Sequence, residues 1–452
     1  MAEIDVAAGA RDVASARLDA ETLARNFADI SPPMRPQDAL VEASRCYFCY
    51  DAPCVQACPT GIDIPGFIKK IGTGNMRGSA LRILEANIFG GACARVCPTE
   101  ILCEGACVRL GDSERAVQIG ALQRHATDWL MAREPTPFSR APLTGRRVAV
   151  VGSGPAGLSC AHRLAMRGHD VVVFEAREKA GGLNEYGIAA YKVPDDFAQD
   201  EVAFILGIGG IEVRPGMTLG ADFTLDELRA DYDAVFLGMG QTGVRALGIA
   251  GEDLPGVRDA VAVIAELRQF PKSDLLIGRR VVVIGGGNTA IDAATQARRL
   301  GAEDVTIVYR RGPETMSATA VEQEWAQTNN VLIRHWAAPL RLLESDGYVL
   351  GVEFARTRAD ATGRAIPAGG TFTLLADMVL KAVGQLFVGG ELGLAIEDGR
   401  IAVDDERRTA LPGIWAGGDC VAGVDLTVTA VEDGKQAAES INRYLMETAD
   451  HG

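Results

Sequence analysis

The sequence lacks the features of several protein classes. Its 452 residues contain no uninterrupted apolar stretch near the ~18 residues of a membrane span. The first twenty residues have neither the basic start nor the apolar core of a signal peptide. Hydrophobic residues make up 48% and charged residues 23%, as in ordinary soluble proteins. We therefore expect a cytoplasmic, multidomain protein without a membrane crossing.

Positive charge and histidine are also scarce. The 45 Lys and Arg residues are outnumbered by 60 Asp and Glu, and the resulting net charge of -15 argues against binding a nucleic-acid backbone. The five histidines are scattered, and no side-chain acid, base or nucleophile stands out. We predict no nucleic-acid partner and no catalytic residue of that kind. Local basic sites for cofactor phosphates stay compatible with this composition.

Cysteine, by contrast, is concentrated. Eight of the ten cysteines fall in two runs, Cys46-x2-Cys49-x4-Cys54-x3-Cys58-Pro59 and Cys93-x3-Cys97-Pro98-x4-Cys103-x3-Cys107. Thiolates at this density, each run with a Cys-Pro step, favour iron–sulfur clusters. Spacing alone divides the eight into two sets of four. Cys160 and Cys420 stand apart, and we do not expect them to pair.

Three other interpretations of the runs are weaker. A disulfide framework needs an oxidising compartment, for which the sequence carries no signal peptide. Structural zinc prefers paired Cys-x2-Cys knuckles, and only Cys46 and Cys49 have that spacing. Incidental buried cysteine does not explain eight in so short a region. The region is therefore predicted to transfer electrons.

The chain divides into a helical part and a part with nucleotide-binding patterns. Helices are predicted at 64–71, 78–88 and 117–131, and no alternating strand pattern appears before residue 133. The segment 133–142 contains three prolines and reads as a linker. We expect a boundary at 135–144.

A βαβ dinucleotide fold begins directly after this linker. The strand from Arg147 runs into Gly152-x-Gly154-x-x-Gly157, a helix follows, and a second strand ends in Glu175. In such folds the glycines permit a tight turn and close approach of a pyrophosphate to the helix N-terminus, and the acid bonds a ribose hydroxyl. The alternative is a glycine turn with only a structural role. It explains the pattern less well, because the strand, the helix and the acidic residue of a dinucleotide site are all present.

The pattern recurs from Arg280, with Gly285, Gly287 and Ala290 in the three small-residue positions. Here the second strand is followed by Arg310-Arg311, which suits a 2′-phosphate, unless the two arginines only form a solvated turn. Near the C-terminus, Gly417-Gly418-Asp419 ends a strand before a helix predicted at 427–444. Asp419 could bond a ribityl or sugar hydroxyl. Two dinucleotides per chain are expected.

These motifs, with Gly181-Gly182-Leu183 and the strand Ala234–Gly240, resemble the flavoproteins that have two dinucleotide domains. The cysteine runs, Glu85-Ala-Asn87 and the segment 119–123 are similar to the module shared by glutamate synthase small subunits and dihydropyrimidine dehydrogenases. Residues 181–194 and 49–54 look most like the bacterial NAD-dependent dihydropyrimidine dehydrogenase flavoprotein subunit. The resemblance implies a helical cluster domain at 1–140, an FAD domain at 145–250 and 387–452, and an inserted NAD(P) domain at 251–386.

The resemblance also implies particular ligands. One [4Fe-4S] cluster would be held by Cys46, Cys49, Cys54 and Cys107, and a second by Cys58, Cys97, Cys103 and Gln123, which leaves Cys93 spare. FAD contacts would come from Gly152, Ser153, Gly154, Gly157, Glu175, Gly182, Leu183, Lys192, Gly418, Asp419 and Thr427. Nicotinamide-dinucleotide contacts would come from Gly285, Gly287, Asn288, Thr289, Arg310 and Arg311. NADPH-linked relatives carry a further cation where this chain has Ser317, so we expect NAD rather than NADP.

The implied activity is that of an electron-input subunit. Hydride would pass between NAD(H) and FAD, and single electrons would pass through two clusters to or from a partner. The expected partner is an FMN-containing dihydropyrimidine dehydrogenase subunit that interconverts uracil or thymine and 5,6-dihydropyrimidines, in a hetero-oligomer. The alternatives are an NADPH-dependent glutamate synthase small subunit and a non-catalytic iron–sulfur and flavin scaffold.

Overall fold

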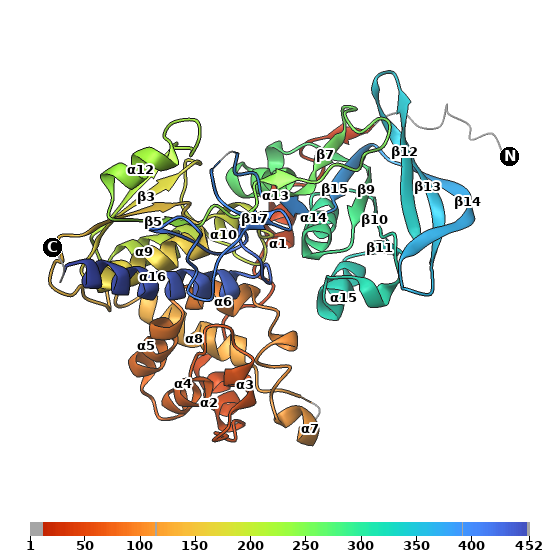
Figure 1. Cartoon of the computed structure of the whole chain (residues 1–452). Helices are drawn as coiled ribbons and strands as arrows, with labels where there is room; N and C mark the ends of the chain where they lie inside the picture. The colour runs from red at the N-terminus through yellow and green to blue at the C-terminus, as the bar shows by residue number, and fades with distance from the viewer. Residues whose placement is uncertain (1–11, 114, 391, 450–452) are drawn as a thin grey trace. The chain divides into compact units, whose positions relative to one another are not determined.

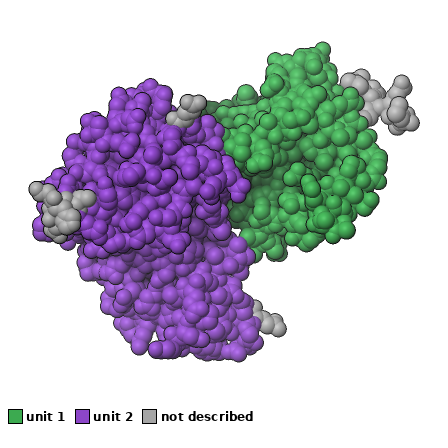
Figure 2. All heavy atoms as spheres, viewed as in Figure 1, with its two compact units in different colours: residues 1–29, 186–194, 243–386 green, residues 30–185, 195–242, 387–452 purple. Residues whose placement is uncertain are grey.

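The computed structural model describes residues 12–113, 115–390 and 392–449 (Figure 1). The chain forms two compact units, which Figure 2 distinguishes by colour. Unit 1 comprises residues 1–29, 186–194 and 243–386, and unit 2 comprises residues 30–185, 195–242 and 387–452. The NAD(P) domain predicted at 251–386 lies within unit 1. Unit 1 also includes residues 186–194, which the sequence analysis placed with FAD.

The first part of unit 2 is helical. Its α-helices are α2 (Pro36–Ser44), α3 (Pro53–Gln56), α4 (Ile64–Gly72), α5 (Met76–Ala86), α6 (Gly90–Val96), α7 (Arg109–Ser113) and α8 (Ile119–Met131). Two helix starts are fixed by side-chain caps, because Asp63 accepts a hydrogen bond from the Gly66 N–H and Asn75 accepts one from the Gly78 N–H. Apolar side chains at helical spacing, such as Phe67, Ile68 and Ile71, form the core.

Unit 2 continues into a parallel sheet of five strands in the order β19-β5-β2-β3-β4. The strands are β2 (Arg147–Val151), β3 (Asp170–Glu175), β4 (Ile211–Pro215), β5 (Ala234–Leu237) and β19 (Ile414–Ala416). The apolar runs of β2, β3, β5 and β19 are buried, as expected of strands covered on both faces, whereas β4 at the edge is only partly buried. The helices of this part are α9 (Pro155–Met166), α11 (Phe197–Leu206), α12 (Leu225–Asp231) and α16 (Thr427–Ala449).

Helices α9 and α16 pack closely, and Figure 1 shows them side by side. A Cβ atom added to Gly434 would lie 2.1 Å from the Ala156 backbone oxygen, so only glycine fits at this crossing. This contact joins the C-terminal helix to the helix of the first glycine-rich turn. Helix α16 is therefore part of the core of unit 2.

Unit 1 contains a second parallel sheet of five strands, in the order β11-β10-β9-β15-β7. Its strands are β7 (Val257–Asp259), β9 (Arg280–Gly285), β10 (Asp304–Val308), β11 (Val331–Arg334) and β15 (Met378–Ala382), and its helices are α1 (Ala20–Asn26), α13 (Ala260–Gln269), α14 (Asn288–Arg299) and α15 (Ala320–Thr328). The two predicted Rossmann-like folds are confirmed.

An antiparallel sheet of three strands also belongs to unit 1, and the sequence analysis did not predict it. It is formed by β12 (Ala337–Ser345), β13 (Tyr348–Ala359) and β14 (Ala365–Leu375). Its buried face, with Val352 and Phe354, packs with Val282 and Ile284 of β9. The described residues also form the short helix α10 (Leu183–Tyr186) and the two-residue strands β1 (Val13–Ala14), β6 (Gly243–Val244), β8 (Ile277–Gly278), β16 (Gln385–Leu386), β17 (Ile396–Glu397) and β18 (Arg400–Ile401).

Candidate functional site

Four cysteines from both runs surround one pocket in the helical part of unit 2. Cys46, Cys49, Cys54 and Cys107 line it together with apolar side chains such as Ile64 and Ile119. Burial, together with the neighbouring Cys46 and Cys107, raises the pKa of the Cys54 thiol to about 11. Folding therefore brings the last cysteine of the second run beside three cysteines of the first.

The arrangement of these thiols fits a group larger than one ion. Within the described ranges, no three His, Cys, Asp or Glu side chains converge closely enough to hold a single metal ion. The four thiols instead surround a pocket with an apolar lining. Soft sulfur ligands spaced around such a pocket suit an iron–sulfur cluster better than tetrahedral zinc.

A second group of thiols gathers around Cys97, at the C-terminal end of α6. The pKa of Cys97 lies well above its usual value because of a hydrogen bond with Cys93, burial, and the proximity of Cys103 and Cys58. Cys93 itself is buried, one helical turn before Cys97. The three cysteines expected to bind a second cluster are thus close together, with Cys93 beside them.

Gln123, the expected fourth ligand, is a buried residue of α8. Its amide Nε2 donates a hydrogen bond of 2.7 Å to the backbone oxygen of Gly90, the first residue of α6. The amide is therefore anchored on the helix that carries Cys93 and Cys97. Both candidates for the fourth ligand, Cys93 and Gln123, lie at this helix.

Glu201 holds the start of α6, and no sequence signal marked it. The Ala92 N–H donates a hydrogen bond of 2.9 Å to its Oε1, and the side chain is fully buried. Burial raises the pKa of this carboxyl to about 8. Arg95 of α6 stacks over Phe197 at 3.4 Å and lies 3.0 Å from Asp128. These contacts fix the cysteine-bearing helix, and the one between Ala92 and Glu201 joins residues 109 apart in the sequence.

The first glycine-rich turn has the form that a dinucleotide requires. A Cβ atom on Gly157 would lie 1.9 Å from the Gly152 backbone oxygen, whereas one on Gly154 would meet nothing closer than 3.8 Å. Helix α9 follows the N-cap residue Gly154, which provides no side-chain cap, so the first turn of the helix can receive an anion. The turn is closely packed at Gly157, and at Gly154 it leaves space for a pyrophosphate to approach the backbone. This geometry fits FAD.

Glu175 ends β3 beside this turn. Its Oε2 accepts hydrogen bonds from the Ser153 N–H at 2.9 Å and from the Ser153 hydroxyl, and its Oε1 accepts one from the Arg177 N–H at 2.8 Å. These hydrogen bonds therefore hold the end of β3 against the glycine-rich turn. The conserved geometry of such folds would place a ribose at this carboxylate.

The Gly181-Gly182-Leu183 segment lies against the same turn. Gly182 has a φ of 56°, and a Cβ atom there would lie 2.6 Å from the Gly154 Cα. Thr427, at the start of α16, donates a hydrogen bond of 3.1 Å to Asn184 Oδ1. Segments that are far apart in the sequence thus meet at the open side of the turn.

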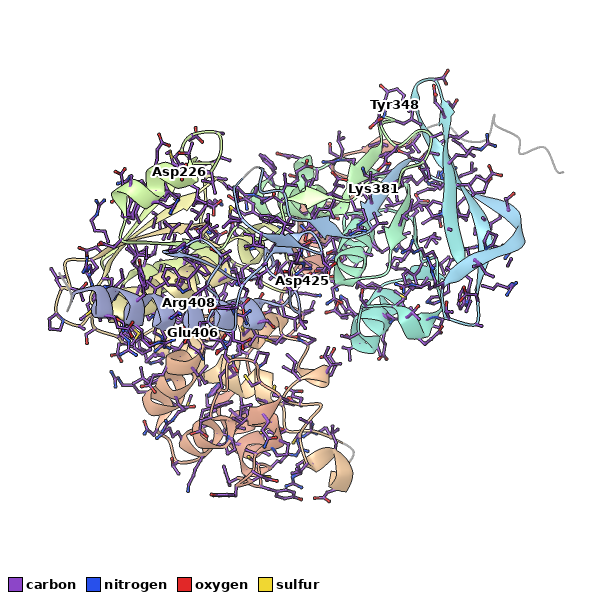
Figure 3. The ribbon with its side chains drawn as sticks, in the orientation of Figure 1. Asp226, Tyr348, Lys381, Glu406, Arg408 and Asp425 are labelled. Carbon is purple, nitrogen blue, oxygen red and sulfur yellow. The ribbon has the colours of Figure 1, made fainter. Side chains whose placement is uncertain are left out.

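Asp419 follows β19 in the same unit. Burial and the neighbouring Asp425 raise its pKa to about 6, although Arg400 opposes this shift. Asp425, labelled in Figure 3, pairs with Arg400 at 2.7 Å. The Gly418 N–H donates to Asp433 Oδ2 at 2.9 Å and thereby fixes the turn that carries Asp419.

The second glycine-rich turn, in unit 1, joins β9 to α14. Helix α14 follows the N-cap residue Gly287, which provides no side-chain cap, and Asn288, Thr289 and Ala290 form its first turn. Ser317 lies beside this turn, since a Cβ atom on Gly287 would be 3.2 Å from the Ser317 Oγ. The uncapped helix start suits a second pyrophosphate.

Arg310 and Arg311 follow β10 as predicted. Arg310 is exposed, and the Arg311 Nε is buried without a hydrogen-bond partner. Lys192, expected to contact FAD, belongs to unit 1. Its Nζ lies 2.8 Å from Asp292 Oδ1 and 2.7 Å from Glu322 Oε1. Burial alone would lower the pKa of Lys192, but the two carboxylates raise it.

Two dinucleotide folds and a cysteine-rich helical domain define a pyridine-nucleotide flavoprotein with an iron–sulfur domain. Residues 23–135 match the family described as dihydropyrimidine dehydrogenase domain II, 4Fe-4S cluster, and residues 146–434 match pyridine nucleotide-disulphide oxidoreductase. The chain belongs to the FAD and iron–sulfur oxidoreductases that include glutamate synthase small chains and dihydropyrimidine dehydrogenase PreT subunits.

Individual relatives support this membership. The chain is 37% identical to a glutamate synthase [NADPH] small chain of Halomonas elongata, over 94% of this chain and 95% of that one. It is 33% identical to the NAD-dependent dihydropyrimidine dehydrogenase subunit PreT of Salmonella typhimurium, over 94% and 98%. These identities establish an NAD(P)-dependent FAD and iron–sulfur oxidoreductase subunit, and they do not separate the two branches.

Solved structures support the fold. FprA of Mycobacterium tuberculosis aligns with a TM-score of 0.58 at 22% identity, covering 69% of this chain and 86% of that one. Thioredoxin reductase of T. acidophilum aligns with a TM-score of 0.52 at 22% identity, covering 67% and 99%.

Cys160 and Cys420 of this chain are both buried and free. The described helices include none long and apolar enough to span a membrane.

Proposed function

We propose that the chain is the electron-input subunit of a larger oxidoreductase. When bound, nicotinamide and FAD exchange a hydride, and iron–sulfur clusters carry electrons singly to or from a partner. The observation that carries this proposal is the pocket lined by Cys46, Cys49, Cys54 and Cys107, in a chain that also has two dinucleotide folds. Four thiols around one pocket are the ligand set of a [4Fe-4S] cluster, and such a cluster transfers single electrons.

The residues of the chain would bind and orient these groups. We assign the pocket to one [4Fe-4S] cluster, and Cys58, Cys97 and Cys103 with Gln123 to a second. We assign the Gly152 turn, Glu175, Gly182, Leu183, Gly418, Asp419 and Thr427 to FAD. We assign the Gly285 turn, Asn288, Thr289, Arg310 and Arg311 to the nicotinamide dinucleotide. We also assign Lys192 to FAD.

We propose an FMN-containing dihydropyrimidine dehydrogenase subunit as the partner. The support is the family match of residues 23–135 and the residues that resemble the NAD-dependent flavoprotein subunits. A large glutamate synthase subunit is the second candidate, favoured by the 37% identity to a glutamate synthase small chain. Relatives of both kinds are named as subunits or chains of larger enzymes.

The rim of the cysteine pocket offers a surface for that partner. Tyr47 and Val108 line the pocket, and their side chains are exposed together with Phe48, Tyr50 and Leu110. Exposed apolar side chains grouped at one place are typical of interaction sites. We propose that the electron-accepting subunit contacts this rim.

Purification of the intact complex tests the partner. A tagged chain expressed in its own cell should retain an FMN subunit active on dihydropyrimidines if the first candidate holds. Retention of a glutamine-dependent amidotransferase would instead support the second. Full turnover of a nicotinamide dinucleotide with a soluble one-electron acceptor, without any partner, would exclude a non-catalytic scaffold.

A further inference from the structure

Arg109 brings a positive charge to the cysteine pocket of unit 2. It is the first residue of α7 and lines the pocket together with Cys46, Cys49, Cys54 and Cys107. Apart from the cysteines, Arg109 is the one charged side chain among the described residues that line this pocket. Water screens a charge poorly where the surroundings are apolar, so this charge acts strongly on a group bound in the pocket.

Contacts with the first cysteine run hold Arg109 in place. Its Nε donates a hydrogen bond of 2.7 Å to the backbone oxygen of Arg45, the residue before Cys46. The guanidinium lies over the ring of Tyr47, with its Cζ 4.0 Å from the ring centroid. Arg45 itself is paired with the buried Glu42. The charge of Arg109 therefore has a fixed place beside the pocket.

The second group of cysteines has an acidic neighbour instead. Glu104 directly follows Cys103, and its Oε1 accepts a hydrogen bond of 2.9 Å from the Gly120 N–H in the first turn of α8. Such a bond stabilises the charged form of a carboxylate. The cation of α6, Arg95, is paired with Asp128 at 3.0 Å. A cation thus lies at the first group of cysteines and a carboxylate at the second.

These charges act on reduction in opposite directions. Reduction adds a negative charge to an iron–sulfur cluster, so a nearby cation favours the reduced state and a nearby carboxylate opposes it. We propose that Arg109 raises the reduction potential of the cluster in the pocket above that of the second cluster. Electrons then collect beside the exposed rim that the partner is proposed to contact.

The step that Arg109 favours moves one electron from the second cluster to the pocket cluster. The second cluster is oxidised, the pocket cluster is reduced, and no bond forms or breaks. This inference deepens the proposed function and rests on its assignment of the two clusters.

Redox titration of the holoprotein tests the order of the two potentials. Dithionite with soluble mediators sets the solution potential without any nicotinamide, and low-temperature EPR follows each cluster. Cys97→Ser should keep only the pocket cluster and Cys49→Ser only the second, so the two variants identify the two signals. In the wild type the pocket signal should appear at the higher potential. Equal potentials, or the reverse order, would overturn the proposal.

Substitutions of Arg109 test the origin of that order. Arg109→Gln should disfavour reduction of the pocket cluster at least about tenfold, which lowers its potential by about 59 mV for one electron. The potential of the second cluster should change less. Arg109→Lys keeps the charge without the hydrogen bond to Arg45, and its pocket potential should stay closer to that of the wild type.

Arg77→Gln is the matched control, because it removes one cation from the same helical part. Arg77 lies on α5 and forms an exposed pair with Glu134, outside the pocket. The same shift in this control would attribute the effect to net charge, and the same shift in Arg109→Lys would attribute it to the hydrogen bond. Either result, or an unchanged potential in Arg109→Gln, would overturn the role of Arg109. If Arg109→Gln does not retain the pocket cluster, Arg109→Lys and the order of potentials in the wild type decide.

Reduction by the nicotinamides separates this inference from the proposed function. If NADH or NADPH reduces the flavin and both clusters but the pocket cluster has the lower potential, the function stands and the inference fails. If the pocket cluster has the higher potential but neither nicotinamide reduces the flavin, the inference stands and the proposed function fails.

Discussion

The Nζ atom of Lys192 lies 2.8 Å from the Asp292 Oδ1, inside unit 1. The same ammonium lies 2.7 Å from Glu322 Oε1, and the Tyr191 ring beside it is fully buried. The segment 186–194 is therefore held on α14 and α15 by a buried ionic cluster. The Ala190 N–H adds a hydrogen bond of 2.9 Å to Gln296 Oε1 of α14.

Replacement of Lys192 by methionine should destabilise unit 1. Two largely buried carboxylates would lose their common cation, at a cost of about 3 kcal/mol in the free energy of unfolding. Arg341→Met is the control, since its exposed pair with Glu353 should contribute less than about 1 kcal/mol. Urea unfolding measures both, and equal stability of the two variants would contradict the ionic cluster.

Cysteine substitutions should separate ligands from neighbours. Cys97→Ser should lose one cluster, so the iron content should fall from about eight to about four atoms per chain. Cys93→Ser should keep both clusters, because Gln123 is proposed as the fourth ligand. Iron analysis and low-temperature EPR of the reduced protein measure this. A Cys93→Ser protein with half the iron would show that Cys93 is the ligand.

Gly182→Ala should prevent FAD binding. The added Cβ would lie 2.6 Å from the Gly154 Cα and would push the glycine-rich turn apart. Gly216→Ala is a matched control in the same unit, because Gly216 also has a positive φ, 69°, but its Cβ would meet nothing within 4 Å. The control should lose about 1 kcal/mol of stability and keep its flavin. Flavin loss in both variants would attribute the effect to backbone strain.

His162 should make the protein sensitive to acid. Burial lowers its pKa to about 3, so the folded state excludes the proton that the unfolded chain binds below about pH 6.5. Its contribution is present above that pH and is lost as the pH falls toward the folded pKa; at pH 5 the loss is about 2 kcal/mol.

The variant His162→Gln isolates this contribution. Unfolding free energies measured at pH 7 and pH 5 should differ by about 2 kcal/mol less in the variant than in the wild type. The comparison between pH values cancels the packing change that the substitution introduces. An identical pH dependence in both proteins would show that His162 takes up its proton without unfolding.

The sequence predicted the two Rossmann-like folds because their signals are local: a buried strand, a glycine turn and a helix follow one another within thirty residues. It did not predict the antiparallel sheet β12–β14, because the exposed stretch around Gly369 and Gly370 interrupts its alternation. The partners of Lys192 lie one hundred residues or more along the chain.

Anaerobic titration of the purified holoprotein with NADPH and NADH tests the central claim most directly. The account predicts that the flavin absorbance bleaches and that EPR signals of reduced iron–sulfur clusters appear in the same titration. Bleaching without any cluster signal would contradict electron transfer through the cysteine-rich domain. No bleaching with either nucleotide would contradict the electron-input function itself.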